Sequence, residues 1–316
     1  MTPFGVCVVG SFMKDLVVRV PRLPRRGETL HGTEFAEFLG GKGVNQAVAA
    51  SRSGARTAMV GRLGADGYGQ EFLALLAAEG IDAGRVTVAE GSGTGVGLPV
   101  VEPDGSNAIV IVPRANATLT AADIADAADR IAAARVVTVQ LELAVETAIE
   151  ALRIASAAGT TTILNPAPMR PTLPPDLVAY ADILVPNAIE AEQLTGRTCD
   201  GDAAAEVAVA LAAKFARRGC VLTLGERGSI VVDGGEPVWL PAHRVDTIDT
   251  VGAGDAFCGA LAARLAAGDS LVDAARYANA AGALSTTIPG AVDGIPATAA
   301  ISALLSNGPV ADLVDD

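Results

Sequence analysis

The sequence predicts an α/β fold with a mainly parallel central sheet covered by helices, and two observations support this prediction. Short β-rich runs alternate with helical stretches through most of the chain, and from residue 121 onward the order helix, strand, helix, strand repeats. Such alternation is typical of βαβ units, whose helices pack on a parallel sheet. Half of the 316 residues are apolar, which is enough for a substantial core. Because no linker rich in Pro, Gly or Ser interrupts the chain, we expect residues 1–316 to form a single domain.

The individual elements follow from local patterns of β-rich and helical residues. A mixed polar and apolar segment, residues 28–38, suits an exposed strand pair. A helix is expected at 253–267, where Phe257, Leu261 and Leu265 fall at i, i+4 and i+8 and give it one apolar face. The other predicted strands cover residues 5–9, 15–20, 56–61, 94–101, 107–112, 136–140, 160–164, 183–185 and 221–224, and the other predicted helices cover residues 44–53, 66–79, 121–134, 145–158, 203–217 and 271–283.

Two segments, at about 16–38 and 93–112, do not fit the α/β alternation. The second contains two extended runs separated by the turn Glu102-Pro-Asp-Gly-Ser106, which is a hairpin signal. The two segments could form a small separate sheet, or they could be edge strands of the main sheet. The pattern alone leaves both possibilities open.

The charge balance limits the classes of partner. The chain has 36 acidic and 23 basic residues and a formal net charge of −13. Such a surface repels nucleic acid and anionic lipids, so we expect no nucleic-acid or membrane partner. An anionic substrate would need a local positive site, such as a helix N-terminus.

Composition also bears on location and on metals. The sequence has no run of about 20 apolar residues that could cross a membrane. Its first residues suit a strand rather than a signal peptide, so we expect a cytoplasmic location. The four cysteines lack the close spacing of a zinc or redox site, and only two histidines are present, so we expect no zinc site.

The strongest chemical signal is Asp249-Thr-Val-Gly-Ala-Gly-Asp255, which runs directly into a helical stretch. Gly252, Ala253 and Gly254 would lie at the start of that helix, where unpaired backbone N–H groups and the helix dipole favour an anion. Asp255 in the first turn could take the proton from a hydroxyl that attacks a γ-phosphate. The alternative is a glycine-rich turn in which Asp255 serves only as a helix cap.

A second signal is Leu39-Gly-Gly-Lys-Gly-Val-Asn45, which also precedes a helix. It is not a phosphate-binding P-loop, because Gly43 follows Lys42 where that motif needs Ser or Thr. Its glycines would let a flat polar ligand lie against the backbone while Lys42 and Asn45 bond to it. The alternative is a tight turn with a surface lysine.

These two strings, in this order and separation, resemble the ribokinase/PfkB family of sugar kinases. The similarity runs from Val8 to about Leu305 and includes Gly10-Ser11, Gln140-Leu-Glu142, Asn165-Pro-Ala-Pro168, Pro186-Asn187 with Glu190, and Thr223-Leu-Gly225 with Gly228. The resemblance implies a ribokinase-like three-layer sandwich, in which the segments 16–38 and 93–112 form a small β-sheet lid that is also a homodimer interface. It further implies a catalytic domain that converts D-ribose and ATP to D-ribose 5-phosphate and ADP with Mg²⁺, activated by K⁺.

The resemblance also implies a role for each matching residue. Asp255 would be the general base, and Gly252, Ala253 and Gly254 would form the anion hole. The sugar would contact Met13, Asp15, Gly41, Lys42, Gly43, Asn45, Glu142 and Asp255. The nucleotide would contact Asn187, Thr223, Gly225, Glu226, Gly228, Gly254 and Asn279. Glu190 would hold Mg²⁺ through water, and the monovalent cation would bind Asp249, Val251, Ser285, Ile288, Gly290 and Gly294. From the residues alone, Asn187 and Glu190 equally suit a helix cap.

Departures from the family pattern leave the sugar open. Met13 stands where ribokinases usually carry Asn, and this variant also resembles deoxyribokinases, so 2-deoxyribose is an alternative substrate. Ala188 stands where Glu often follows the Pro-Asn pair. The sequence is also compatible with a kinase for a different alcohol, such as a nucleoside or a phosphorylated hexose, and with an inactive sugar or nucleotide sensor on the same fold.

Overall fold

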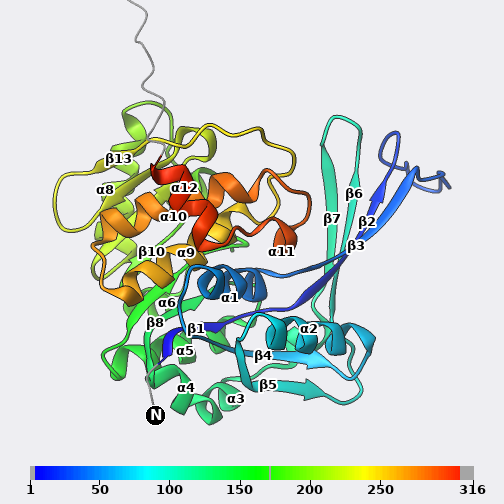
Figure 1. Cartoon of the computed structure of the whole chain (residues 1–316), viewed down its shortest axis with the longest axis horizontal. Coiled ribbons are helices and arrows are strands. Elements are labelled where there is room, and N and C mark those ends of the chain that lie inside the picture. Colours follow the sequence, from blue (N-terminus) through cyan, green and yellow to red (C-terminus); the bar gives the residue numbers. More distant parts are fainter. Residues whose placement is uncertain (1–3, 171, 307–316) are drawn as a thin grey trace, which may run out of the picture.

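The chain folds into two sheets that differ in size and surroundings. The computed structural model describes residues 4–170 and 172–306. A nine-stranded sheet lies among the helices, and a four-stranded sheet stands apart from it. In Figure 1 the strands β2, β3, β6 and β7 extend from one side of the helical body. The predicted α/β class, with a mainly parallel central sheet and a small additional sheet, is confirmed.

The large sheet has the strand order β13-β12-β11-β10-β9-β8-β1-β4-β5. Neighbouring strands are parallel from β5 to β11, and β12 and β13 are added antiparallel at one edge. The strands are β1 (Phe4–Val9), β4 (Thr57–Gly64), β5 (Asp82–Ala89), β8 (Ala134–Val139), β9 (Thr161–Leu164), β10 (Ile183–Leu184), β11 (Gly219–Thr223), β12 (Ser229–Val232) and β13 (Val238–Leu240).

Helices cover both faces of this sheet. In β1, Val6 and Val8 belong to one apolar core, while Cys7 and Val9 belong to a second core on the opposite face. The first core includes residues of α1 (Lys42–Arg52), α2 (Gly67–Ala78), α9 (Ala253–Ala267), α10 (Leu271–Ser285), α11 (Ala291–Gly294) and α12 (Thr298–Ser306). The second includes residues of α3 (Ala121–Asp126), α4 (Ala128–Ala132), α5 (Val145–Ala157), α6 (Pro175–Ala179), α7 (Ala188–Thr195) and α8 (Ala203–Phe215). Because successive strand residues face opposite cores, the buried strands are predominantly apolar on both faces.

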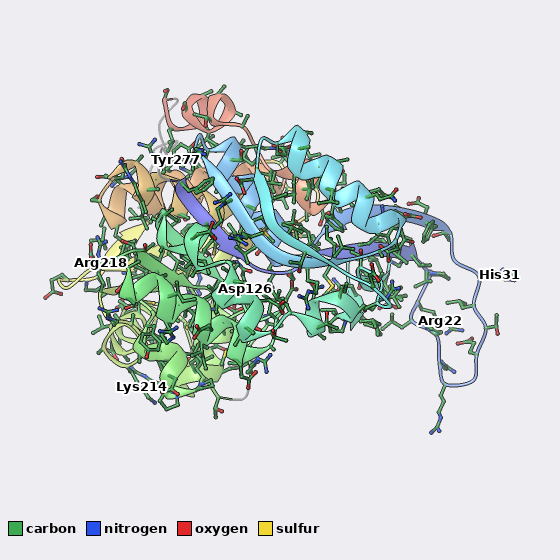
Figure 2. The ribbon with its side chains drawn as sticks, turned by 90° about the horizontal axis from the view of Figure 1, so that it is seen from below. Arg22, His31, Asp126, Lys214, Arg218 and Tyr277 are labelled. Carbon is green, nitrogen blue, oxygen red and sulfur yellow. The ribbon has the colours of Figure 1, made fainter. Side chains whose placement is uncertain are left out.

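The small sheet has the order β3-β2-β6-β7. It consists of β2 (Met13–Arg19), β3 (Glu34–Gly40), β6 (Gly95–Val101) and β7 (Asn107–Val112). The outer pairs are antiparallel and the central pair, β2 with β6, is parallel. The alternative that these segments are edge strands of the main sheet is therefore wrong. Figure 2 shows Arg22 and His31 on the loop between β2 and β3, far from the body of the molecule.

Several element predictions need correction. The strand pair expected in 28–38 is a single strand, β3, because Glu28 closes a local loop by pairing with Arg22 and accepting from the Arg25 N–H at 2.9 Å. The helix expected at 121–134 is divided into α3 and α4 at Ala127, and strand β8 already begins at Ala134. Strands β5, β12 and β13 and helices α6, α11 and α12 were not predicted.

Helix α9 is also more buried than its sequence suggests. Phe257 and Leu261 are buried as predicted, but so are Ala256, Cys258, Gly259, Ala260, Ala262 and Ala263. Small residues on the remaining faces allow close packing against α1 and α10, so α9 is a central helix rather than a surface helix with one apolar face. Two short 3₁₀ helices, η1 (Arg114–Thr118) and η2 (Gly225–Arg227), complete the elements, and no helix in the described ranges is long and apolar enough to span a membrane.

Candidate active site

A cavity of about 540 Å³ is bordered by the small sheet and by the N-terminal ends of α1 and α9. Most of the residues predicted to bind the sugar line it. The predicted residues on its wall are Met13, Asp15, Gly41, Lys42, Asn45, Glu142, Asp249, Val251, Gly252, Asp255 and Gly290. The wall of the cavity on the side of the small sheet includes Val17, Phe38, Ile109 and Ile111. The site is therefore polar at the helix ends, while the wall formed by the sheet combines these apolar side chains with Asp15, Arg19 and Asn107.

Asp255 lies in the first turn of α9, and its carboxylate is held by two amides of α1. Asn45 Nδ2 donates to one carboxylate oxygen at 3.0 Å, and Gln46 Nε2 donates to the other at 3.1 Å. Asp255 is only 5 % exposed, and it still lines the cavity. The carboxylate therefore has a fixed orientation towards the space where a ligand would bind.

Asn45 offers a further polar atom. Its Nδ2 donates a hydrogen bond to Asp255, while its Oδ1 is buried and has no hydrogen-bond partner among the described residues. Buried polar atoms are normally paired, so an unpaired acceptor on the cavity wall fits a ligand that donates a hydrogen bond.

Two glycines bring backbones into contact at this site. A Cβ on Gly43 would lie 2.3 Å from the Ser11 amide nitrogen and 2.4 Å from the Gly10 carbonyl carbon. Gly43 is thus required for the close approach of α1 to the end of β1, and it is not itself on the cavity wall. Gly41, which caps α1, has a φ of 101°, a conformation that favours glycine.

Asp15 and Glu142 are two carboxyl groups of the site whose pKa values are raised. Burial raises the pKa of Asp15 to about 6, and the negative charge of Glu142 raises it further. Burial also raises the pKa of Glu142, against the opposing effects of Lys42 and of a hydrogen bond from Ser11. Glu142 accepts from the Lys42 backbone N–H at 2.9 Å. These two acceptors suit a ligand with several hydroxyl groups.

Lys42 supplies the positive charge of the site. The negative charge of Asp255 raises the pKa of the Lys42 ammonium, burial opposes this, and the charges of Glu142 and Glu190 add to the increase. Lys42 is therefore cationic and lies within the field of three carboxylates.

The N-terminus of α9 has the geometry expected of an anion site. Gly252 is the N-cap with a φ of 81°, in the left-handed region that glycine adopts without strain. No described atom lies within 4 Å of a Cβ built on Gly254, so a ligand can approach the backbone there. The free N–H groups of a helix start attract negative charge.

Asn187 and Glu190 form a capping box at the start of α7. Asn187 Oδ1 accepts from the Glu190 N–H at 2.8 Å, and Glu190 Oε2 accepts from the Asn187 N–H at 2.9 Å. The helix-cap interpretation is therefore correct. The other carboxylate oxygen of Glu190 remains outside this box, and burial raises the pKa of the group.

None of the residues predicted to contact the nucleotide lines the 540 Å³ cavity, although Gly254 lies between the cavity residues Gly252 and Asp255. Thr223 forms a parallel bridge with Asn187, which places these two residues side by side. Gly228 and Asn279 meet at the end of β13: a Cβ on Gly228 would lie 2.0 Å from the Leu240 carbonyl oxygen, and Asn279 Nδ2 donates to the same oxygen at 3.3 Å. Gly225 and Glu226 belong to the exposed η2 turn.

The predicted cation residues come together from three segments. Asp249 accepts from the N–H groups of Val251 and Gly290, at 3.0 and 2.9 Å, which joins the loop before α9 to the loop after α10. A Cβ on Gly294 would lie 2.5 Å from the Ser285 carbonyl oxygen and 3.0 Å from that of Ile288. Gly294 thus leaves room beside converging carbonyl oxygens, which are ligands that hard cations accept.

Three side chains of the site were not assigned a role from the sequence. Ser11 donates to Glu142, Gln46 donates to Asp255, and Asn116 pairs with both the N–H and the carbonyl of Phe12. Gln46 directly follows the predicted Asn45, but nothing in the local sequence indicates which buried groups surround it.

Comparisons with known proteins identify the family of the chain. The model of the pfkB family carbohydrate kinases matches residues 4–298. A ribokinase of Mus musculus is 40% identical over 267 residues, covering 83% of this chain and 82% of its own length. A deoxyribokinase of Salmonella typhimurium is 34% identical over 257 residues, covering 81% and 84%. The structure of Arabidopsis thaliana ribokinase complexed with ribose and ATP superposes with a TM-score of 0.88 at 30% identity, covering 96% of this chain and 99% of that one. The chain therefore belongs to the pfkB family of carbohydrate kinases.

Proposed function

We propose that this protein is an ATP-dependent ribokinase, which transfers the γ-phosphoryl group of ATP to a primary hydroxyl of D-ribose. The observation that supports this proposal most directly is the placement of Asp255. Its carboxylate is oriented by two amides, lines a polar cavity, and lies in the first turn of a helix whose start suits a phosphate.

In this mechanism Asp255 accepts the proton of the attacking hydroxyl. The hydroxyl oxygen forms a bond to the γ-phosphorus, the bond from that phosphorus to the bridging oxygen breaks, and ADP leaves with the electron pair. Gly252 and Gly254 would present backbone N–H groups to the negative charge that is transferred, whereas the N–H of Ala253 between them donates to the Thr250 carbonyl at 3.3 Å. Catalysis then depends on position and charge rather than on a covalent intermediate.

The other polar residues of the cavity would hold the sugar. Asp15, Glu142 and the free Oδ1 of Asn45 accept hydrogen bonds from its hydroxyls, and Lys42 donates. The unpaired Oδ1 would gain a partner on binding, which removes the cost of burying it alone. The structure with ribose and ATP at 30% identity supports this choice of substrates.

A divalent ion fits the acidic side of the site. Glu190 has one carboxylate oxygen outside its capping box, and such an oxygen can hold hydrated Mg²⁺. The ion would neutralise charge on the ATP phosphates. Thr223, Gly225, Glu226, Gly228 and Asn279 would shape the adjoining nucleotide surface, since Asn187 and Thr223 are neighbours there.

We also propose that K⁺ activates the enzyme. Asp249 and the carbonyl oxygens of Ser285 and Ile288 would hold it beside Gly294, with Val251 and Gly290 next to them. Bound there, the ion would hold the loop that leads into the start of α9. Replacing K⁺ by a large organic cation at constant ionic strength should lower kcat, and an unchanged kcat in K⁺-free buffer would contradict the proposal.

A panel of acceptors tests the substrate. ADP release with ATP should be fast with ribose and slower with fructose and nucleosides. Deoxyribose is a second candidate, because Met13 presents a thioether and no strong hydrogen-bonding group to the cavity, and a deoxyribokinase is among the relatives. Tight binding of ribose and ATP without ADP release would instead identify an inactive sensor.

Asp255→Asn tests the base. We expect kcat to fall by about 10²–10⁴-fold, because the amide cannot accept the proton, while sugar affinity stays near that of the wild type. Single-turnover kinetics and ribose binding by calorimetry measure the two quantities. A variant with more than about a tenth of the wild-type kcat would rule out this role for Asp255.

We propose that the small sheet acts as a lid and as a homodimer interface. Ile109, Val110, Ile111 and Val112 of β7 are each more than two-fifths exposed, and β7 is an edge strand of this sheet. An apolar edge strand of this kind is normally covered by a partner.

A cytoplasmic location is consistent with the proposed use of ATP. All four cysteines are buried as free thiols, which is common in proteins of reducing compartments. Subcellular fractionation tests this proposal, and recovery with the secreted proteins would contradict it.

A further inference from the structure

We infer that Gln46 is a positioning residue for the phosphoryl transfer: it fixes the orientation of the Asp255 carboxylate without touching the substrate. Gln46 is completely buried and is not on the wall of the cavity. Its Nε2 donates to Asp255 Oδ1 at 3.1 Å. The inference rests on the proposed role of Asp255 as the general base.

The surroundings of Gln46 determine which way its amide points. Its Oε1 accepts from Thr138 Oγ1 at 2.8 Å and from Gln140 Nε2 at 2.6 Å, both at the end of β8. A hydroxyl and an amide can donate or accept, whereas an ionised carboxylate only accepts, so the Oε1 of Gln46 faces Thr138 and Gln140 and its NH₂ group faces the side of Asp255. That side holds two acceptors, the Asp255 carboxylate and Asn165 Oδ1, the latter at 3.3 Å.

Asn165 is itself fixed in the same way. Its Nδ2 donates to the Val185 carbonyl at 2.8 Å, so its Oδ1 is directed at Gln46. The amide of Gln46 is therefore held by strand residues at three points, Thr138, Gln140 and Asn165, and only its fourth hydrogen bond reaches the catalytic group. In a buried network of this kind each member restrains the next.

Helix packing brings Gln46 to the carboxylate. Gly259 lies one helical turn after Asp255, and a Cβ there would be 2.3 Å from the carbonyl oxygen of Gln46 itself. The backbones of α1 and α9 are thus in contact at the position of the Gln46–Asp255 hydrogen bond. This backbone contact fixes the distance between the two helices at the point where the side chains of Gln46 and Asp255 meet.

Asn45 and Gln46 therefore serve different purposes, although both donate to Asp255. Asn45 lines the cavity and has a free Oδ1 for the sugar, so its loss should affect sugar binding. Both polar atoms of the Gln46 side chain are hydrogen-bonded within the protein, and none of its surface is exposed. Its loss should therefore affect only the orientation of the base. A displacement of the base by about 1 Å can cost on the order of 10²-fold in rate.

Gln46→Glu is the decisive variant, because it has nearly the same shape and keeps an oxygen for Thr138 and Gln140. When ionised, the new carboxylate offers no donor to Asp255 and repels it. We expect kcat at pH 8 to fall by about 10–10²-fold while the KM for ribose changes by less than about threefold. When protonated, the new carboxyl can donate to Asp255, so the ratio of variant to wild-type kcat should rise as the pH is lowered from 8 to 6.

The remaining ionisable groups near this pair are Lys42, Glu142, Glu190 and the Cys258 thiol, and all are present in both proteins. Dividing the variant profile by the wild-type profile therefore removes their contribution.

Thr138→Val is the matched second variant, because it removes one of the two donors to Gln46 Oε1 at nearly constant volume. It should lower kcat by a few-fold with an unchanged KM, and it decides the question if Gln46→Glu does not fold by circular dichroism.

Three outcomes would overturn the inference: a wild-type kcat for Gln46→Glu, a loss expressed mainly in KM, or a pH-independent ratio of variant to wild type. A wild-type kcat for Thr138→Val with Gln46→Glu unfolded would do the same. These results are distinguishable from a failure of the proposed function. If Asp255→Asn is inactive and Gln46→Glu is fully active, only the positioning role is wrong; if Asp255→Asn is active, the assignment of the base is wrong.

Discussion

At the scale of single residues, we expect Met13 to influence how strongly the cavity binds a sugar hydroxyl. Its side chain is buried, lies on the cavity wall, and its sulfur accepts a weak hydrogen bond from Asn116 Nδ2 at 3.8 Å. A thioether makes no strong bond to a hydroxyl. An apolar contact of this kind discriminates only weakly against an additional hydroxyl.

Met13→Asn should therefore change the choice between ribose and 2-deoxyribose. The amide can bond to a sugar hydroxyl, and a sugar that lacks this hydroxyl leaves the amide unpaired at a cost of about 1–3 kcal/mol. We expect the ratio of kcat/KM values to shift towards ribose by about tenfold or more, measured by ADP release with both sugars. An unmoved ratio would show that Met13 is only a packing residue.

The raised pKa of Asp15 leads us to expect that sugar binding depends on pH. Because its pKa is raised to about 6 by burial and by Glu142, Asp15 is ionised at pH 8 and becomes protonated as the pH falls through about 6. The protonated carboxyl loses acceptor capacity, so the KM for ribose should increase below pH 6, by at most about tenfold per pH unit for one proton.

Steady-state kinetics between pH 5 and 8 measure this effect. Asp15→Asn is the control: it should bind ribose more weakly at every pH and lose that part of the pH dependence. Because the pKa of Glu142 is also raised, a residual slope in the variant is expected from that group. An identical profile in both proteins would exclude Asp15 as its source.

At the scale of elements, the contact between α1 and α9 holds the site together. Gly259 permits this contact, since a Cβ there would be 2.5 Å from Ala49 Cβ and 2.9 Å from the Ala50 nitrogen. Gly259→Ala should lower the free energy of unfolding by about 1–3 kcal/mol, because backbone atoms cannot move aside as a flexible side chain can.

Urea unfolding of Gly259→Ala, with Gly67→Ala as the control, measures this cost. Gly67 is also at a helical position, in α2, but a Cβ there has no described neighbour within 4 Å. The control should be neutral or slightly stabilising, because Ala has the higher helix propensity. Equal free energies of unfolding for the two variants would mean that α1 and α9 accommodate the added methyl group without a loss of stability.

At the scale of the whole molecule, the small sheet carries a continuous run of exposed apolar residues, 109–112 of β7. Val110 is 59 % exposed and Leu98, its partner in the register, is 38 % exposed, on the face opposite the cavity residues Ile109 and Ile111. If two copies associate through this sheet, light scattering at micromolar concentration should give twice the chain mass of 31.7 kDa.

Val110→Lys tests whether the small sheet forms the dimer interface. A charge placed in an apolar interface opposes association, so the dimer should dissociate at higher protein concentration than in the wild type. Glu90→Lys, a charge change outside the small sheet, is a suitable control. A stable wild-type monomer would contradict the proposed dimer.

The sequence by itself determined the parts of this protein that depend on local pattern. Alternating β-rich and helical runs gave the α/β class, because each element's periodicity is set by nearby residues. The string from Asp249 to Asp255 located the start of α9, since glycines and a following apolar run mark a helix N-terminus locally. Positions where burial or a local loop overrides the pattern, such as the all-round burial of α9 and the segment 28–33, were predicted wrongly.

Only the tertiary structure decided which groups surround the base. Gln46 lies 92 residues from Thr138, 94 from Gln140, 119 from Asn165 and 209 from Asp255, and no local pattern relates positions so far apart. The same holds for the raised pKa of Asp15, which depends on burial beneath the small sheet and on the charge of Glu142. Chemistry-bearing residues can be recognised by type and spacing, but the hydrogen bonds that orient them arise only when strands and helices distant in sequence pack together.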